Sequence, residues 1–260
     1  MNRQRSAPAG SRLDALSGRY DESGPGLPNA LGPYLHEDWM RYGSASSGYG
    51  EVGWTRSNVS GSGGSIILST PTTAQEYGVA QLRTGSQSGR GSTLHTSAVV
   101  QMYQPGIGMV WATKVDMNNT ASIEVWSGFS SSTSGRVRVT DSTQFIGIRY
   151  LSTEGEWQGV CKNGSTATNE STVSLGSHAA GTYVRFGFEA VDTGGGTLGM
   201  QFFSLDTDER HQLTRTLIGD PITDNIPVTT GPLAAGVVTL TGSQRIVYQD
   251  WYGYGGRTAR

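Results

Sequence analysis

The sequence predicts an all-β protein in which two sheets pack face to face behind an extended N-terminal arm. The first observation is composition: 38 of the 260 residues are Gly and only 15% are charged, which is typical of short strands joined by turns. The second is the recurrence of segments in which apolar and polar residues alternate. The third is their number, because about ten strands are expected to form two packed sheets.

The chain divides into an arm, residues 1–36, and a sandwich domain, residues 37–260. The arm mixes Pro, Arg and Leu without strand alternation. We expect it to become ordered on a partner, and a flexible tail is the alternative. The arm residues expected to contact that partner are Arg3, Arg5, Arg12, Leu13, Leu16, Arg19, Tyr20 and Leu27.

Ten segments of the sandwich domain have the composition of strands. They span residues 76–84, 92–103, 107–115, 121–129, 144–152, 156–164, 182–192, 198–206, 235–241 and 245–253. Between them, Asn163-Gly164 can supply the positive φ angles of a two-residue hairpin turn, and the three glycines 194–196 can reverse the chain.

Alternation within segment 182–192 predicts which side is buried. The core face is expected to carry Val184, Phe186, Phe188 and Ala190. The opposite face, directed to solvent or to a partner, is expected to carry Tyr183, Arg185, Gly187 and Glu189.

The last strand is rich in aromatic residues, with Trp251, Tyr252 and Tyr254 close together. Such a cluster can stack a sugar, or it can close a sheet by packing. We favour packing, because a large aromatic ring buries much apolar area. A sugar platform formed by these three residues remains the alternative.

Composition and charge exclude several classes of function. The net charge of −2 and the absence of a basic face with interleaved aromatics disfavour a nucleic-acid partner. No segment has the roughly 20 apolar residues of a membrane span. The single Cys161 and four scattered His lack metal-ligand spacing, so we expect no cofactor and no metal. Cys161 is expected to be a buried, unpaired thiol.

Several motifs follow one another in an order that resembles a known family. A strand containing Gly-Phe, the hairpin pattern Trp157-x-x-Val160-x-x-Asn163-Gly164 and the terminal aromatic strand are similar to concanavalin A-like sandwich domains. The versions found in bacteriophage virion proteins resemble residues 60–256 most. The resemblance implies a two-sheet concanavalin A-like jelly roll whose last strand pairs within a sheet near the start of the domain.

Catalytic motifs are missing where the resemblance suggests looking for them. Family 16-type glucanases with this fold use Glu-x-Asp-x-x-Glu on one strand, and this chain has no such stretch. Glu124, Glu154 and Glu156 are interpreted as solvated strand charges. No Gly-x-Ser-x-Gly motif lies between a strand and a helix. We therefore expect no enzymatic activity.

These observations lead to the hypothesis of a phage virion structural protein, a capsid decoration or cement subunit made in the host cytoplasm. Its expected partners are the major capsid protein or other virion subunits, together with copies of itself in a homo-oligomer. One alternative is a tail or fibre component that binds host carbohydrate. A further alternative is a degenerate glycan hydrolase.

The arm makes a testable prediction about attachment. Exposed arginine pairs weaken with salt, whereas Leu13 and Leu16 buried in a groove contribute roughly 1.5–3 kcal/mol each and persist. We expect occupancy on purified particles to survive high salt and to fall after Leu13→Ala with Leu16→Ala, as measured by quantitative gel analysis. Stripping by salt, with normal binding of the double variant, would show that the arm is an electrostatic tether.

Overall fold

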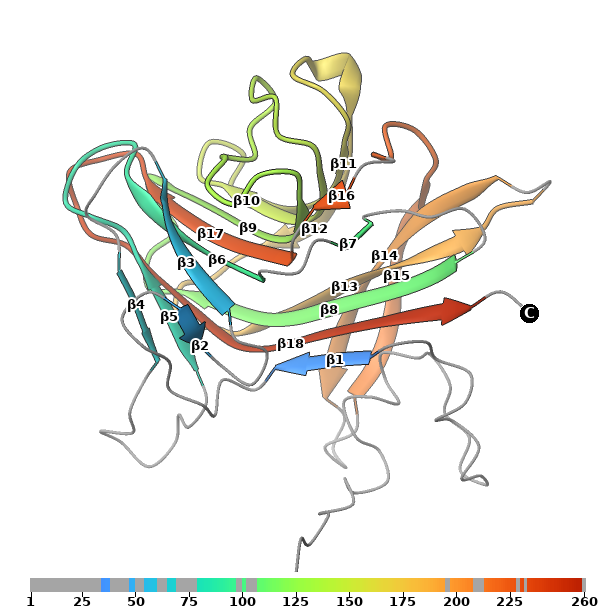
Figure 1. Cartoon of the computed structure of the whole chain (residues 1–260), viewed down its shortest axis with the longest axis horizontal. Helices are drawn as coiled ribbons and strands as arrows, with labels where there is room; N and C mark the ends of the chain where they lie inside the picture. Colours follow the sequence, from blue (N-terminus) through green and yellow to red (C-terminus); the bar gives the residue numbers. More distant parts are fainter. Residues whose placement is uncertain are drawn as a thin grey trace, which may run out of the picture.

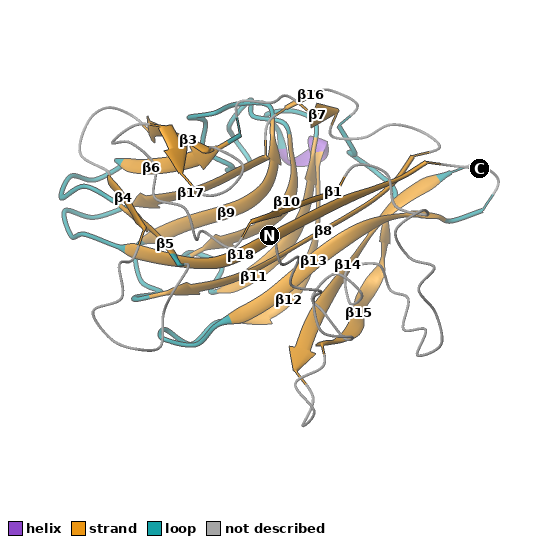
Figure 2. Cartoon of the chain, turned by 60° about the horizontal axis from the view of Figure 1, so that its bottom comes forward, coloured by secondary structure: helices purple, strands orange, loops and turns teal. Residues whose placement is uncertain are grey.

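The computed structural model describes residues 34–37, 47–49, 54–59, 65–68, 79–96, 100–101, 107–194, 197–207, 213–227, 230–231 and 233–258. These residues form two antiparallel sheets stacked as a sandwich (Figure 1), so the prediction of an all-β sandwich is confirmed. The helix described is one short 3₁₀ turn, Ala167–Asn169, purple in Figure 2. Within the described ranges, no helix has the length and apolar character to cross a membrane.

Sheet A has eight strands, with β18 and β8 near its centre (Figure 2). Seven of them follow one another across the sheet, and the eighth, β1, pairs with a different stretch of β18 from the one that pairs with β5. In spatial order its other strands are β15 (Leu213–Ile222), β14 (Leu198–Thr207), β13 (Val184–Asp192), β8 (Ile107–Met117), β18 (Ile246–Thr258), β5 (Ala80–Arg83) and β4 (Ser65–Leu68), with β1 at Tyr34–Glu37.

Sheet B lies above sheet A in Figure 1. In spatial order its strands are β12 (Glu170–Ser177), β11 (Glu156–Lys162), β10 (Phe145–Leu151), β9 (Ile123–Ser130), β17 (Leu233–Thr239), β6 (Gly91–His95), β3 (Trp54–Val59) and β2 (Ser47–Tyr49). A separate two-stranded ladder joins β7 (Val100–Gln101) to β16 (Thr230–Gly231).

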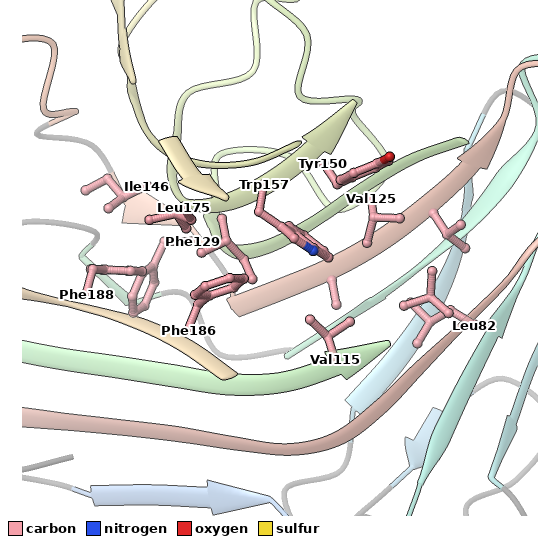
Figure 3. Packing of buried hydrophobic residues seen from close by; sticks show 14 of the residues in the cluster. Leu82, Val115, Val125, Phe129, Ile146, Tyr150, Trp157, Leu175, Phe186 and Phe188 are labelled. Carbon is pink, nitrogen blue, oxygen red and sulfur yellow. The ribbon is translucent and has the colours of Figure 1, made fainter. Parts of the chain in front are cut away.

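The core fills the space between the sheets with apolar and aromatic side chains (Figure 3). Phe186 and Phe188 of β13 are buried there, with Val184 and Ala190 packed against the cluster, which confirms the alternation predicted for this strand. The Phe188 ring meets the Phe129 ring of sheet B edge-on at 6.1 Å between centroids. Each large side chain buried in this way contributes about 1.5–3 kcal/mol.

The terminal aromatic segment lies inside sheet A. Trp251, Tyr252 and Tyr254 are opposite Lys114, Thr113 and Trp111 of β8 in the ladder. On the other side of β18, β1 pairs with the same stretch, since Leu35 is opposite Tyr254. The last strand therefore pairs within sheet A next to β1, near the start of the domain, as the resemblance implied.

Three local predictions need correction. Segment 92–103 is two strands, β6 and β7, which belong to different sheets. Strands β1 to β4, β12 and β15 lie outside the ten predicted segments. Ser and Thr in 170–177 and Gly and Pro in 213–222 resemble loop composition. The Asn163-Gly164 turn is also wrong: seven residues connect β11 to β12, and the Asn163 N–H donates to the Asn169 carbonyl. The expected chain reversal between β13 and β14 is confirmed, since the two strands pair antiparallel, Gly194 has φ +108° and the Thr193 N–H donates to the Thr197 carbonyl.

The division at residue 36 stays a prediction. Strand β1 begins at Tyr34 and includes the last residues assigned to the arm. The eight arm residues predicted to contact a partner all lie outside the described residues.

Cys161 lies on the core side of β11, fully buried and unpaired, as predicted. Burial raises the pKa of its thiol far above its usual value. Cys161→Ser places a hydroxyl in this apolar site and is expected to lower the free energy of unfolding by roughly 1–3 kcal/mol, measured by urea denaturation. An unchanged denaturation midpoint, or a disulfide-linked dimer on a non-reducing gel, would contradict this placement.

Candidate functional site

The outer face of sheet B, the face turned away from sheet A, carries an unusual set of polar side chains. Cross-strand register brings Trp126 of β9 opposite Arg149 of β10 on one side and opposite Gly236 of β17 on the other. The same row continues through Thr93 of β6 to Ser57 of β3. Directly paired residues share a face, so this row crosses the sheet from β10 to β3.

Loop 131–144, which connects β9 to β10, lies over this face; Figure 1 shows it in lime green on the side of sheet B away from sheet A. Val137 of the loop is buried in a second apolar cluster, separate from the main core. The other members of that cluster come from the strands and the loop end: Val59, Trp126, Phe145, Val160 and Val238. The loop therefore covers the centre of the face by apolar packing.

Trp126 lies flat against its neighbouring strand. A Cβ atom at Gly236 would approach the Trp126 ring to 2.1 Å, so only Gly fits at that position. The indole is 1% exposed, and its Nε1 has no hydrogen-bond partner among the described residues.

Glu124 of β9 holds the loop on the sheet through two ion pairs. Arg136 donates to its Oε2 from Nε at 2.8 Å, and Arg138 donates to its Oε1. Glu124 is only 4% exposed, so its interpretation as a solvated strand charge is wrong. A carboxylate in this position stays buried because two guanidinium groups compensate its charge.

Arg149 forms a second buried pair. Its two terminal nitrogens donate to the Glu170 carboxylate at 2.7 and 2.8 Å, and further bonds reach the Gln158 side chain and the Val137 carbonyl. The Arg149 and Glu170 side chains are 2% and 5% exposed. The planar guanidinium thus connects β10, β11, β12 and the covering loop.

Lys162 of β11 binds the C-terminal part of the loop through backbone carbonyl groups. Its Nζ donates to the carbonyl oxygens of Asp141, Thr143 and Gly164, and the side chain is fully buried. Burial lowers the pKa of this ammonium, and the carboxylates of Glu170 and Asp141 oppose that shift. Three carbonyl acceptors match the three donors of an ammonium, which accounts for a buried lysine here.

Ser57 and His95 form a hydroxyl–imidazole pair at the β3–β6 side of the face. Ser57 Oγ is 3.0 Å from His95 Nε2, and His95 Nδ1 is 3.2 Å from the Thr96 carbonyl oxygen. The loop reaches this region too, because the Thr93 hydroxyl donates to the Thr133 carbonyl.

His178 has a different, closed environment near the edge of the core. Trp157 Nε1 donates to its Nδ1 at 3.1 Å, so Nε2 carries the proton and lies 3.1 Å from Asp116 Oδ1. Both ring nitrogens are occupied and the side chain is fully buried, which indicates a packing role.

The residues selected from the sequence do not coincide with this face. Trp251, Tyr252 and Tyr254 belong to β18 of sheet A, and the arm residues are outside the described ranges. Sequence reasoning missed Ser57, His95 and the Arg149–Glu170 pair, whose members are far apart in the chain. Only an expectation of β3–β6 pairing would have brought Ser57 next to His95.

The chain was compared with known proteins. No family model and no curated protein matches it. Among solved structures, it is similar to an endo-1,3-beta-glucanase from Streptomyces sioyaensis, with a TM-score of 0.51 and 9% identity over 91% of this chain and 100% of that one. A native glycosidic hydrolase has a TM-score of 0.50 and 15% identity over 85% and 94%. A protein of unknown function from Shewanella oneidensis MR-1 has a TM-score of 0.51 and 12% identity, with 87% of each chain covered.

The fold is a concanavalin A-like jelly roll. Identities of this size show the fold alone, and the sandwich spans nearly the whole of each similar structure.

The comparison also corrects the prediction that the chain is not an enzyme. Two of the structures that share its fold are hydrolases by their descriptions. The missing Glu-x-Asp-x-x-Glu stretch excludes one arrangement of catalytic groups on this fold; it does not exclude enzymes as a class.

The Arg149–Glu170 pair makes a testable prediction. Arg149→Ala leaves a buried carboxylate without its partner and is expected to cost about 3–5 kcal/mol of unfolding free energy. Arg138→Ala is the matched control: the Arg138 side chain is 38% exposed, Arg136 still neutralises Glu124, and the expected cost is about 1 kcal/mol or less. Equal costs for the two variants in urea denaturation would contradict the assigned role of Arg149.

Proposed function

We propose that the chain is a carbohydrate-directed domain of a bacteriophage particle, with the sandwich facing a surface polysaccharide of the host. The supporting observation is the fold itself, which matches an endo-1,3-beta-glucanase and a glycosidic hydrolase over most of this chain and nearly all of theirs. The matched part therefore makes up nearly all of each of those two chains.

The outer face of sheet B is our candidate for the carbohydrate-contacting surface. On its β3–β6 side the half-buried hydroxyl groups of Thr55 and Ser57 lie next to the covering loop, and the buried His95 supports Ser57 from behind. Sugar hydroxyls are recognised by a few well-placed polar groups on a rigid support. A platform formed by Trp251, Tyr252 and Tyr254 is the rival location.

The particle assignment derives from the resemblance of residues 60–256 to phage virion domains and from the composition of the arm. In this proposal the arm attaches the domain to capsid or tail subunits, and the sandwich remains outside. A decoration subunit and a tail component differ in where the arm attaches. Immunogold labelling of intact particles distinguishes a head position from a tail position.

Binding to carbohydrate is tested with a bulky substitution on the candidate face. Thr55 is half-buried and pairs with His95, so Thr55→Trp adds a large ring beside the polar groups. We expect wild-type protein to bind a polysaccharide in a panel of host envelope glycans and laminarin, and Thr55→Trp to bind at least about tenfold more weakly. Affinity electrophoresis measures both.

The control is Thr216→Trp, at an exposed position on β15 of sheet A, which is expected to bind like the wild type. Absence of binding across the panel would overturn the carbohydrate assignment. Normal binding by Thr55→Trp, with loss in a Trp251→Ala variant, would move the site to the terminal aromatic segment.

A further inference from the structure

We propose that Ser57 and His95 form a nucleophile–base pair that hydrolyses carboxylic esters. The geometry carries this inference by itself. The choice of O-acylated carbohydrate as the natural substrate rests in addition on the proposed function.

The hydrogen bonds fix the roles of the two imidazole nitrogens. The Thr96 carbonyl can only accept, so the proton lies on Nδ1, which donates to it across 3.2 Å. Nε2 is then left with its lone pair and accepts from the Ser57 hydroxyl at 3.0 Å. A nucleophile bonded to a base that is itself oriented by a third group is the arrangement that activates serine in acyl transfer.

The supporting strands hold this arrangement rigidly. Ser57 is paired with Thr93 and His95 with Thr55, so both residues lie on the β3–β6 ladder rather than on a loop. His95 is 8% exposed, whereas Ser57 is only half-buried. The imidazole is thus held among its neighbours while the hydroxyl that it contacts remains reachable from the surface, which suits a reaction with a ligand there.

The other described histidine that bonds side chains does not offer this chemistry. His178 accepts from Trp157 and donates to Asp116, so it has no free lone pair for a hydroxyl. Ser174, a serine on the same sheet, donates to the Glu156 carboxylate and has no imidazole in its hydrogen bond.

The reaction proceeds in two balanced steps. Ser57 Oγ attacks the ester carbonyl carbon while its proton passes to His95 Nε2; the C–O bond to the alcohol then breaks, and the alcohol leaves with that proton. Water next gives a proton to Nε2 and attacks the acyl-serine, which releases the carboxylic acid and restores the Ser57 hydroxyl. One ester and one water give one acid and one alcohol, and no other reactant is needed.

A fluorophosphonate probe tests the pair directly, since an activated serine displaces fluoride and stays covalently labelled. The full-length protein is incubated with the probe and analysed by peptide mass spectrometry. We expect labelling at Ser57, no labelling in Ser57→Ala, and labelling roughly 100-fold slower in His95→Gln, which keeps a polar contact but cannot take the proton. Ser174→Ala is the control and is expected to label like the wild type.

Thermal unfolding verifies that each variant is folded, and hydrolysis of p-nitrophenyl acetate gives a second readout that should follow the labelling. A folded wild-type protein that is not labelled at Ser57 overturns the proposal. So does labelling of His95→Gln at the wild-type rate. Neither assay contains a glycan, so a negative result overturns the Ser57–His95 pair and does not bear on polysaccharide binding. Likewise, absence of polysaccharide binding does not bear on the labelling of Ser57.

Discussion

The structure depends on the ion pairs and carbonyl contacts that hold loop 131–144 against the outer face of sheet B. All eight residues of β9 are buried, as are six of the seven residues of β10. A strand in a two-layer sandwich is normally buried on one face only, so these central strands need a third layer. Loop 131–144 is that layer. Glu124, Arg149 and Lys162 hold it on the sheet through charge-assisted hydrogen bonds.

The same constraint decides which chemistry the face can offer. Glu124 and Glu170 are held by arginines, so neither is available as one of the two carboxylates of a glycoside hydrolase. At the margin of the loop, on the β3–β6 side, the half-buried Ser57 meets the buried His95. The fold is thus similar to that of an endo-1,3-beta-glucanase and a glycosidic hydrolase, while the chemistry that we propose for this face rests on Ser57 and His95.

The fold was largely predictable from the sequence, because alternation in segments such as 182–192 reports directly on burial. The terminal strand was also expected to pair within a sheet, and β18 does so between β8 on one side and β5 and β1 on the other. Strands β12 and β15 escaped prediction because Ser, Thr, Gly and Pro are ambiguous between loops and strands. The candidate site was not predicted, for a different reason. Glu124 was interpreted from the sequence of its own strand, whereas its burial depends on ion pairs with Arg136 and Arg138, which lie on a loop. Ser57 and His95 are 38 residues apart and meet only through strand pairing.

The central claim is that loop 131–144 is a structural layer of sheet B, and hydrogen exchange of the native protein tests it most directly. If the claim holds, amides of residues 136–143 exchange slowly, with protection within about tenfold of that of neighbouring amides in β9 and β10, because opening the loop exposes buried charges. Exchange of the whole loop within seconds, alongside protected strands, would show that it is an ordinary surface connection and would contradict the account.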